Sequence, residues 1–177
     1  MGLSGDLGRG PVGLDSAIFI YFIEEHPQYV QLAAQIFGDV DDRRIDAVTS
    51  SITLLETLMV PYRTGDSSLA NRYEALLTRS RGLTLLELDR GQLRAAAHLR
   101  ALYRLRTPDA LQLSAAISAR CTAFVTNDRR LPAVRGMRIL HGSTDIVVET
   151  RLYRSALPVA RADCSPGGHR LRASGGY

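Results

Sequence analysis

The stretch from residue 105 to residue 131, LRTPDALQLSAAISARCTAFVTNDRRL, constrains the fold of this chain more than any other. Thr107 and Pro108 predict a helix start, with Thr107 as the N-cap and Pro108 at the first helical position. Small and apolar residues then recur at helical spacing, and the apolar run 123–125 predicts a short buried strand. The stretch therefore places Asp109 at the start of a helix and Asp128 just after a strand. Ligands bind at this edge of open α/β sheets.

Strands and helices alternate along the rest of the chain, which predicts an α/β fold with a mostly parallel sheet and helices on both faces. The expected strands are 12–14, 45–48, 83–88, 123–125 and 137–140. The expected helices are 16–25, 27–37 with an end near Gly38, 51–61 with an end disturbed by Pro61, 68–78, 89 or 91 to 103, and one that begins at 107. A length of 177 residues suits a single domain, which we expect at 12–148. A loose leader (1–11) and a disordered Arg-, Gly- and Pro-rich tail (149–177) would flank it.

Composition excludes several kinds of protein. All 22 basic residues are arginine, which excludes lysine Schiff-base chemistry and a phosphate loop that depends on lysine. The longest apolar run, 17–23, is too short to cross a membrane, and the N-terminus does not resemble a secretory signal. Cys121 and Cys164 make no disulfide framework, so we expect a cytoplasmic protein. The four histidines are scattered and none lies beside a candidate nucleophile.

Four acidic residues follow strands or open helices at corresponding positions. Asp15 follows the first expected strand, and Glu56 lies early in the helix after the second. Asp109 and Asp128 occupy the positions described above. In a parallel sheet all four fall near the C-terminal edge of the strands.

Each of these acids also has a purely structural interpretation. Asp15 is a possible helix cap, and Glu56 completes a capping box with Thr53. Asp109 would be favoured by a helix dipole, and Asp128 would belong to a turn. Taken together, however, four carboxylates at one edge repel each other unless a cation compensates their charge. Oxygen ligands indicate a hard metal ion, Mg²⁺ or Mn²⁺.

Four segments of the chain resemble the motifs of a known family. LDSAIFIYFIE, SSITLLE, TPDALQLSAA and FVTND are similar, in this order, to motifs of PIN-domain ribonucleases, especially the VapC-like toxins of type II toxin–antitoxin pairs. The resemblance covers roughly residues 12–140 and implies a PIN-like three-layer fold. It also implies an Mg²⁺-dependent endoribonuclease that cleaves single-stranded RNA with a metal-activated water. The leader before the first strand and the Arg-rich tail depart from the usual pattern.

The resemblance also implies a role for each site residue. The acidic quartet would be Asp15, Glu56, Asp109 and Asp128, with Asp15 and Asp109 as direct metal ligands. Glu56 and Asp128 would hold metal-bound waters or a second ion. Ser16, Thr126 and Asn127 match the polar residues beside the acids and would form outer hydrogen bonds or bind phosphate.

Arginines flank the two strongest motifs. Arg104, Arg106, Arg129 and Arg130 would bind an RNA backbone, although ordinary solvated surface is the alternative for each of them. No aromatic stacking platform is evident, and Tyr62 and Tyr73 are expected to pack in the interior.

Other interpretations remain open at this point. A housekeeping PIN or flap-type nuclease without an antitoxin would have the same site, and a non-catalytic nucleic-acid-binding module could have the same fold. A haloacid-dehalogenase-type phosphatase needs an Asp-x-Asp pair, but this chain has Asp15-Ser16-Ala17. The family resemblance further implies a homodimer and an antitoxin partner that lies across the site. The apolar segments 17–23 and 54–59 could form such contacts, although we expect them to belong to the core.

Overall fold

A five-stranded parallel sheet forms the centre of the protein in the computed structural model, which describes residues 10–142. The strand order is β3-β2-β1-β4-β5, and each neighbouring pair is parallel. The strands are β1 (Val12–Leu14), β2 (Ala47–Ser50), β3 (Leu83–Leu86), β4 (Ala123–Thr126) and β5 (Arg138–His141). The predicted α/β architecture is confirmed. The expected domain limit at 148 and the tail lie outside the described residues.

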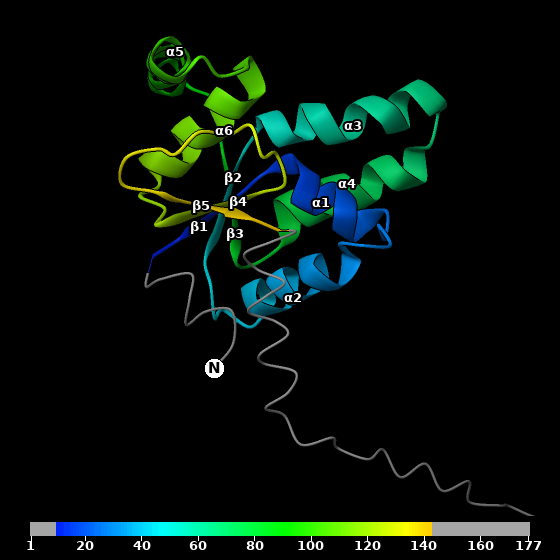
Figure 1. Cartoon of the computed structure of the whole chain (residues 1–177). Coiled ribbons are helices and arrows are strands. Elements are labelled where there is room, and N and C mark those ends of the chain that lie inside the picture. The colour runs from blue at the N-terminus through cyan, green and yellow to red at the C-terminus, as the bar shows by residue number, and fades with distance from the viewer. Residues whose placement is uncertain (1–9, 143–177) are drawn as a thin grey trace, which may run out of the picture.

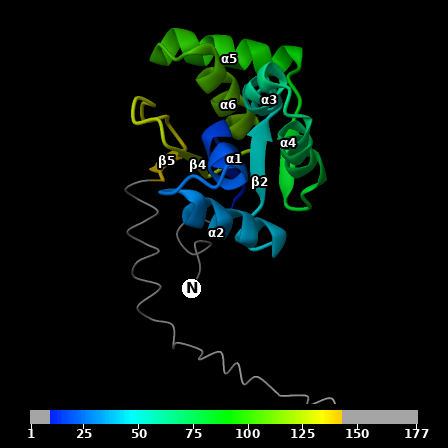
Figure 2. The same cartoon turned by 90° about the vertical axis from the view of Figure 1, so that its right-hand side faces the viewer.

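Helices cover both faces of this sheet and give three layers (Figure 1). They are α1 (Ser16–Ile23), α2 (Val30–Asp41), α3 (Ile52–Thr64), α4 (Ser67–Arg79), α5 (Arg90–Tyr103) and α6 (Thr107–Ser118). The helices α1, α2 and α4 pack on one face, whereas α6, covered by α5, packs on the other. The view turned by 90° shows the same separation (Figure 2). In residues 10–142 no helix is long and apolar enough to cross a membrane.

The strand side chains alternate between two hydrophobic cores. Leu14 and Val125 point into the core shared with α1, α2 and α4. Val48 and Phe124 point into the core shared with α5 and α6. Both faces of the central strands are therefore buried, which explains why these strands read as short apolar runs.

The strand order indicates where on the sheet a ligand would bind. The chain runs from β1 outward through β2 to β3, and then returns to place β4 on the other side of β1. The order therefore reverses between β1 and β4. Ligands of open α/β sheets bind in the crevice beyond the carboxyl ends of the strands at such a reversal.

Two helices continue past residues that were expected to end them. The helix α2 runs through Gly38 to Asp41, because Phe37 and Val40 are buried in the core on either side of the glycine. This burial outweighs the roughly 1 kcal/mol that a glycine costs in a helix. Likewise α3 passes through Pro61, whose side chain is buried, and ends at Thr64, just before Gly65, which has a φ of 73°.

Several local predictions were wrong by one or a few residues. Thr107 is the first residue of α6 rather than its N-cap, which is Arg106. The start of α2 is Val30 rather than Pro27, and β2 begins at Ala47 rather than Ile45.

The expected core also needs correction on α3. Tyr73 is fully buried as predicted, but the Tyr62 side chain is 66% exposed. In the segment 54–59, Leu55 and Met59 are likewise exposed, at 66% and 51%. By contrast, the segment 17–23 belongs mainly to the core, with Phe19 fully buried. These residues lie on the part of α3 that does not pack on its neighbours α4, α1 and α6.

Candidate active site

The four predicted acids come from four elements whose ends meet beside the β1–β4 reversal. Asp15 lies directly between β1 and α1, and Asp128 follows the end of β4. Glu56 lies in the second turn of α3, which follows β2, and Asp109 lies in the first turn of α6. All four side chains are at least partly withdrawn from water.

Asp15 is held by hydroxyl groups on two neighbouring elements. Thr126 Oγ1 donates to Asp15 Oδ2 over 2.6 Å, and Ser16 Oγ lies 3.2 Å from Asp15 Oδ1. Although Asp15 occupies the N-cap position of α1, its side chain makes no capping hydrogen bond. The capping interpretation therefore does not explain this carboxylate.

Glu56 is joined to Asp15 through Ser16. The Ser16 hydroxyl donates to Glu56 Oε2 over 2.7 Å. Because a hydroxyl has one proton to donate, the shorter contact to Glu56 is the stronger hydrogen bond, and the 3.2 Å contact to Asp15 is the weaker one. The helix α3 already begins at Ile52, which places Thr53 inside it rather than at its cap. Glu56 thus faces α1 across 40 residues of sequence, and the proposed capping box is not what fixes it.

Burial and mutual repulsion raise the pKa values of three of the carboxyl groups. Burial is the largest cause for Asp15, Glu56 and Asp109. The charge of Asp15 raises the pKa of Glu56 and of Asp109, and the charge of Asp128 raises the pKa of Asp15 and of Asp109. Arg106 partly opposes this at Asp109. The acids are therefore close enough to destabilise each other when charged.

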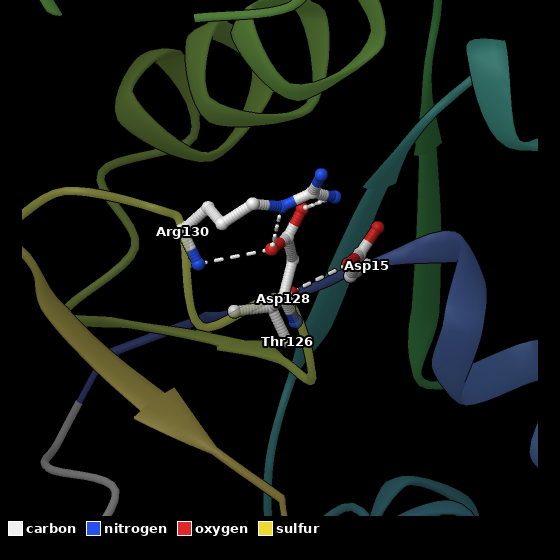
Figure 3. Close-up of polar contacts among 4 residues, drawn as sticks. All are labelled: Asp15, Thr126, Asp128 and Arg130. Atoms are coloured by element: carbon white, nitrogen blue, oxygen red, sulfur yellow. Dashed lines mark hydrogen bonds and ion pairs between the residues drawn. The ribbon is translucent and has the colours of Figure 1, made fainter.

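Asp128 is turned toward an arginine of its own loop. Arg130 Nε donates to Asp128 Oδ1 over 2.8 Å, and Arg130 Nη2 donates to Asp128 Oδ2 over 2.7 Å. The Arg130 backbone N–H also donates to Oδ1, which closes the turn that the sequence allowed. Figure 3 shows both oxygens of Asp128 directed at the guanidinium.

The polar residues beside Asp128 have different surroundings. Thr126 is buried, and its hydroxyl accepts the backbone N–H of Asp128 while it donates to Asp15. Asn127 instead donates from its amide nitrogen to the Tyr21 hydroxyl of α1, over 2.9 Å. Thr126 therefore joins two of the acids, whereas Asn127 ties the loop to α1.

A buried polar network beneath the acids was not expected from the sequence. Gln112 Nε2 donates to Thr53 Oγ1 over 2.6 Å, and Thr49 Oγ1 donates to the backbone oxygen of Leu14 over 2.9 Å. Gln112 also lowers the pKa of Glu56 through a side-chain hydrogen bond. Its position three residues after Asp109 puts both side chains on one face of α6, and this spacing was the available signal.

The donor chemistry of this cluster fits a hard divalent cation. All four acidic groups offer carboxylate oxygens, and the charged forms of Asp15, Glu56 and Asp109 are disfavoured by burial and by neighbouring charges. Within residues 10–142, no three Asp, Glu, His or Cys side chains are already arranged closely enough to hold an ion. An ion bound here would have to compete with Arg130 for the carboxylate oxygens of Asp128.

Comparison with solved structures shows that other proteins share this fold. The chain resembles VapBC2 from Rickettsia felis bound to a promoter DNA fragment, with a TM-score of 0.56, 16% identity and coverage of 73% of this chain and 97% of that one. It resembles a toxin–antitoxin complex from Klebsiella pneumoniae, with a TM-score of 0.57, 17% identity and coverage of 75% and 98%. For DNA-bound VapBC from Salmonella typhimurium the TM-score is 0.53 and the identity 23%, with coverage of 75% and 98%.

Two sequence comparisons give different results. The comparison with curated proteins gives no significant match. The model of the PIN domain matches residues 12–137, which include all four acids and every strand except β5. The chain therefore belongs to the PIN domain family.

Proposed function

We propose that this protein is a metal-dependent endoribonuclease that cleaves single-stranded RNA. The observation that carries the proposal is the meeting of Asp15, Glu56 and Asp109 with raised pKa values at the β1–β4 reversal. An acidic cluster of this kind is stable in its charged form only with a cation, and its oxygen ligands favour Mg²⁺ or Mn²⁺. Membership of the PIN domain family supports a nuclease.

The proposed roles are those that the resemblance to PIN-domain ribonucleases implies. Asp15 and Asp109 would be the direct ligands. Glu56 and Asp128 would hold coordinated waters or a second ion, and one of the two would orient the attacking water. A bound divalent ion supplies an activated water and stabilises charge on the phosphate. Ser16 and Thr126 would fix the orientation of Asp15 through the hydroxyl contacts described above.

Removal and return of the metal tests this proposal. The parent protein should cleave a defined pool of single-stranded RNA in Mg²⁺, lose that activity in EDTA and recover it when excess Mg²⁺ or Mn²⁺ is added. A heat-denatured sample of the same preparation controls for contaminating nucleases that survive heating. Undiminished cleavage in EDTA would rule out a metal-dependent reaction.

We further propose that the protein is the toxin of a toxin–antitoxin pair and acts in the cytoplasm. Its structural neighbours include toxin–antitoxin complexes. An apolar stripe on α3, formed by Leu55, Met59 and Tyr62, is 51–66% exposed and lies on the helix that carries Glu56. We propose that an antitoxin binds this stripe and extends from it toward Glu56 and the other acids. We also propose a homodimer, which light scattering would detect.

A negative charge in the apolar stripe should weaken binding of the antitoxin. In Met59→Asp, we expect growth arrest by the toxin to persist when the small protein encoded beside its gene is co-expressed, because a buried unpaired carboxylate opposes the contact. The matched control is Leu102→Asp on α5, whose leucine is 72% exposed. Both sites are exposed, so stability should change by less than about 0.5 kcal/mol. If the co-expressed small protein relieves growth arrest equally for Met59→Asp and Leu102→Asp, the stripe is excluded as the antitoxin contact. If no neighbouring protein relieves arrest by the parent, a housekeeping nuclease is favoured.

A further inference from the structure

One arginine side chain occupies both carboxylate oxygens of a proposed catalytic acid. Arg130 makes three hydrogen bonds to Asp128, from Nε, from Nη2 and from its own backbone N–H, at 2.7–2.9 Å. Paired side-chain bonds of this kind have the geometry that also suits a phosphate group. The guanidinium therefore holds Asp128 and matches the charged group of an RNA substrate.

The same ion pair is open to water. The Arg130 side chain is 66% exposed, whereas the Asp128 side chain is 24% exposed. Exposed ion pairs contribute little net stability, because water screens them and the long side chain loses freedom. A divalent ion or a phosphate can therefore displace either partner at small cost.

Displacement would matter because Asp128 acts on the other acids. Its charge disfavours the ionised forms of Asp15 and Asp109. Its backbone N–H donates to the Thr126 hydroxyl that in turn donates to Asp15. Thus the guanidinium partly neutralises the carboxylate that repels two others, in a loop that is tied directly to Asp15 (Figure 3).

We propose that Arg130 is an exchangeable counter-ion of Asp128 and a positioning residue for the reaction. It neutralises Asp128 before a metal ion enters the cluster. Once Asp128 turns to the ion, the released guanidinium binds a phosphate of the single-stranded RNA. This inference rests on the proposed function. It adds that the Arg130 side chain opposes metal binding and favours RNA binding.

The test compares Arg130→Gln with the parent. In RNA-free protein, calorimetric titration with Mn²⁺ should show about 2–5-fold tighter binding by Arg130→Gln, since the ion no longer competes with an exposed ion pair. With a dye-labelled single-stranded RNA pool as substrate, KM should rise about 2–5-fold with little change in kcat. The dependence of RNA affinity on salt should fall by a slope of about 0.7, the value for one phosphate contact on a single strand.

The controls separate this role from a structural one. Arg135→Gln removes the same charge from an exposed position of the same loop. It should change the affinities for Mn²⁺ and for RNA much less than Arg130→Gln does. Arg130→Lys keeps the charge without the paired geometry and should give intermediate values. The backbone N–H of residue 130 can still close the turn in both variants of Arg130, and thermal unfolding checks the fold.

The two measurements have opposite expected signs, which a loss of folding would not produce. Weaker binding of both Mn²⁺ and RNA by Arg130→Gln would assign Arg130 a structural role and overturn the inference. Unchanged Mn²⁺ affinity would overturn the exchange, and an unchanged KM would overturn the RNA contact. If the parent binds no Mn²⁺, the proposed function itself fails and the inference fails with it.

Discussion

Asp109→Asn is expected to remove RNA cleavage and to stabilise the metal-free protein. The substitution keeps the shape of the side chain but removes a charge from a proposed metal ligand. Loss of a metal contact that supplies several kcal/mol of transition-state stabilisation lowers the rate by at least about 10²-fold. The rate of cleavage of a defined RNA pool, measured in Mg²⁺, gives this effect.

The stability effect has the opposite sign because of the direction of the pKa shift. Burial and the charges of Asp15 and Asp128 raise the pKa of Asp109 in the folded protein. A raised carboxyl pKa means that the folded state binds the proton more tightly than the unfolded state, so stability falls as pH rises through that pKa. At neutral pH in EDTA, the Asn variant should gain less than about 1 kcal/mol, because solvent screens this partly exposed group, and its Tm should rise by at most about 2–4 °C.

Asp46→Asn provides the matched control for both measurements. Asp46 is exposed and precedes β2, at the opposite edge of the sheet from the four acids. We expect its substitution to leave both the cleavage rate and the Tm in EDTA nearly unchanged. A fall in both rate and Tm for Asp109→Asn would instead show that Asp109 has a structural role.

Gly13→Ala is expected to destabilise the protein and to disturb the site together. Gly13 lies in β1 beneath α6, and a Cβ at this position would lie 2.5 Å from Phe124 Cδ2 and 2.9 Å from Ala116 Cβ. The strand and the helix would have to separate, which costs about 1–3 kcal/mol by overpacking. Since Asp15 directly follows β1 and Asp109 lies in the first turn of α6, the cleavage rate should fall as well. Denaturant unfolding measures the first effect.

Gly38→Ala is the counterpart with the opposite expected sign. Gly38 is an exposed interior residue of α2, and a Cβ there would meet no atom within 4 Å. Alanine in place of glycine should therefore stabilise the helix by about 0.5–1 kcal/mol without a change in activity. Similar unfolding free energies for the two alanine variants would contradict the close approach of β1 and α6.

The sequence was sufficient to predict the strands and the four elements that carry the acids, because these features are local. Apolar runs bounded by polar residues predicted β1 and β4. Helix continuation was less predictable. Gly38 and Pro61 are unfavourable in isolation, and only the burial of their neighbours or of the proline itself keeps α2 and α3 helical.

Side-chain partners across the fold were the least predictable part of the site. The sequence near Glu56 has the pattern of a capping box. In the folded protein, however, Glu56 accepts a hydrogen bond from Ser16 of α1. The sequence placed Arg130 near Asp128 without indicating that both carboxylate oxygens would face it. Such pairings depend on loop geometry and on distant segments, neither of which has a periodic signature.

The contact between Asp15 and Thr126 joins residues 111 positions apart, and β1 reaches its neighbour β4 only when most of the domain has been made. Closing such a long loop is entropically unfavourable until the intervening helices have packed. A growing chain on the ribosome therefore carries its first acid from the start of synthesis but cannot assemble the complete cluster until β4 has emerged. The proposed nuclease therefore cannot act before β4 has been made and has emerged.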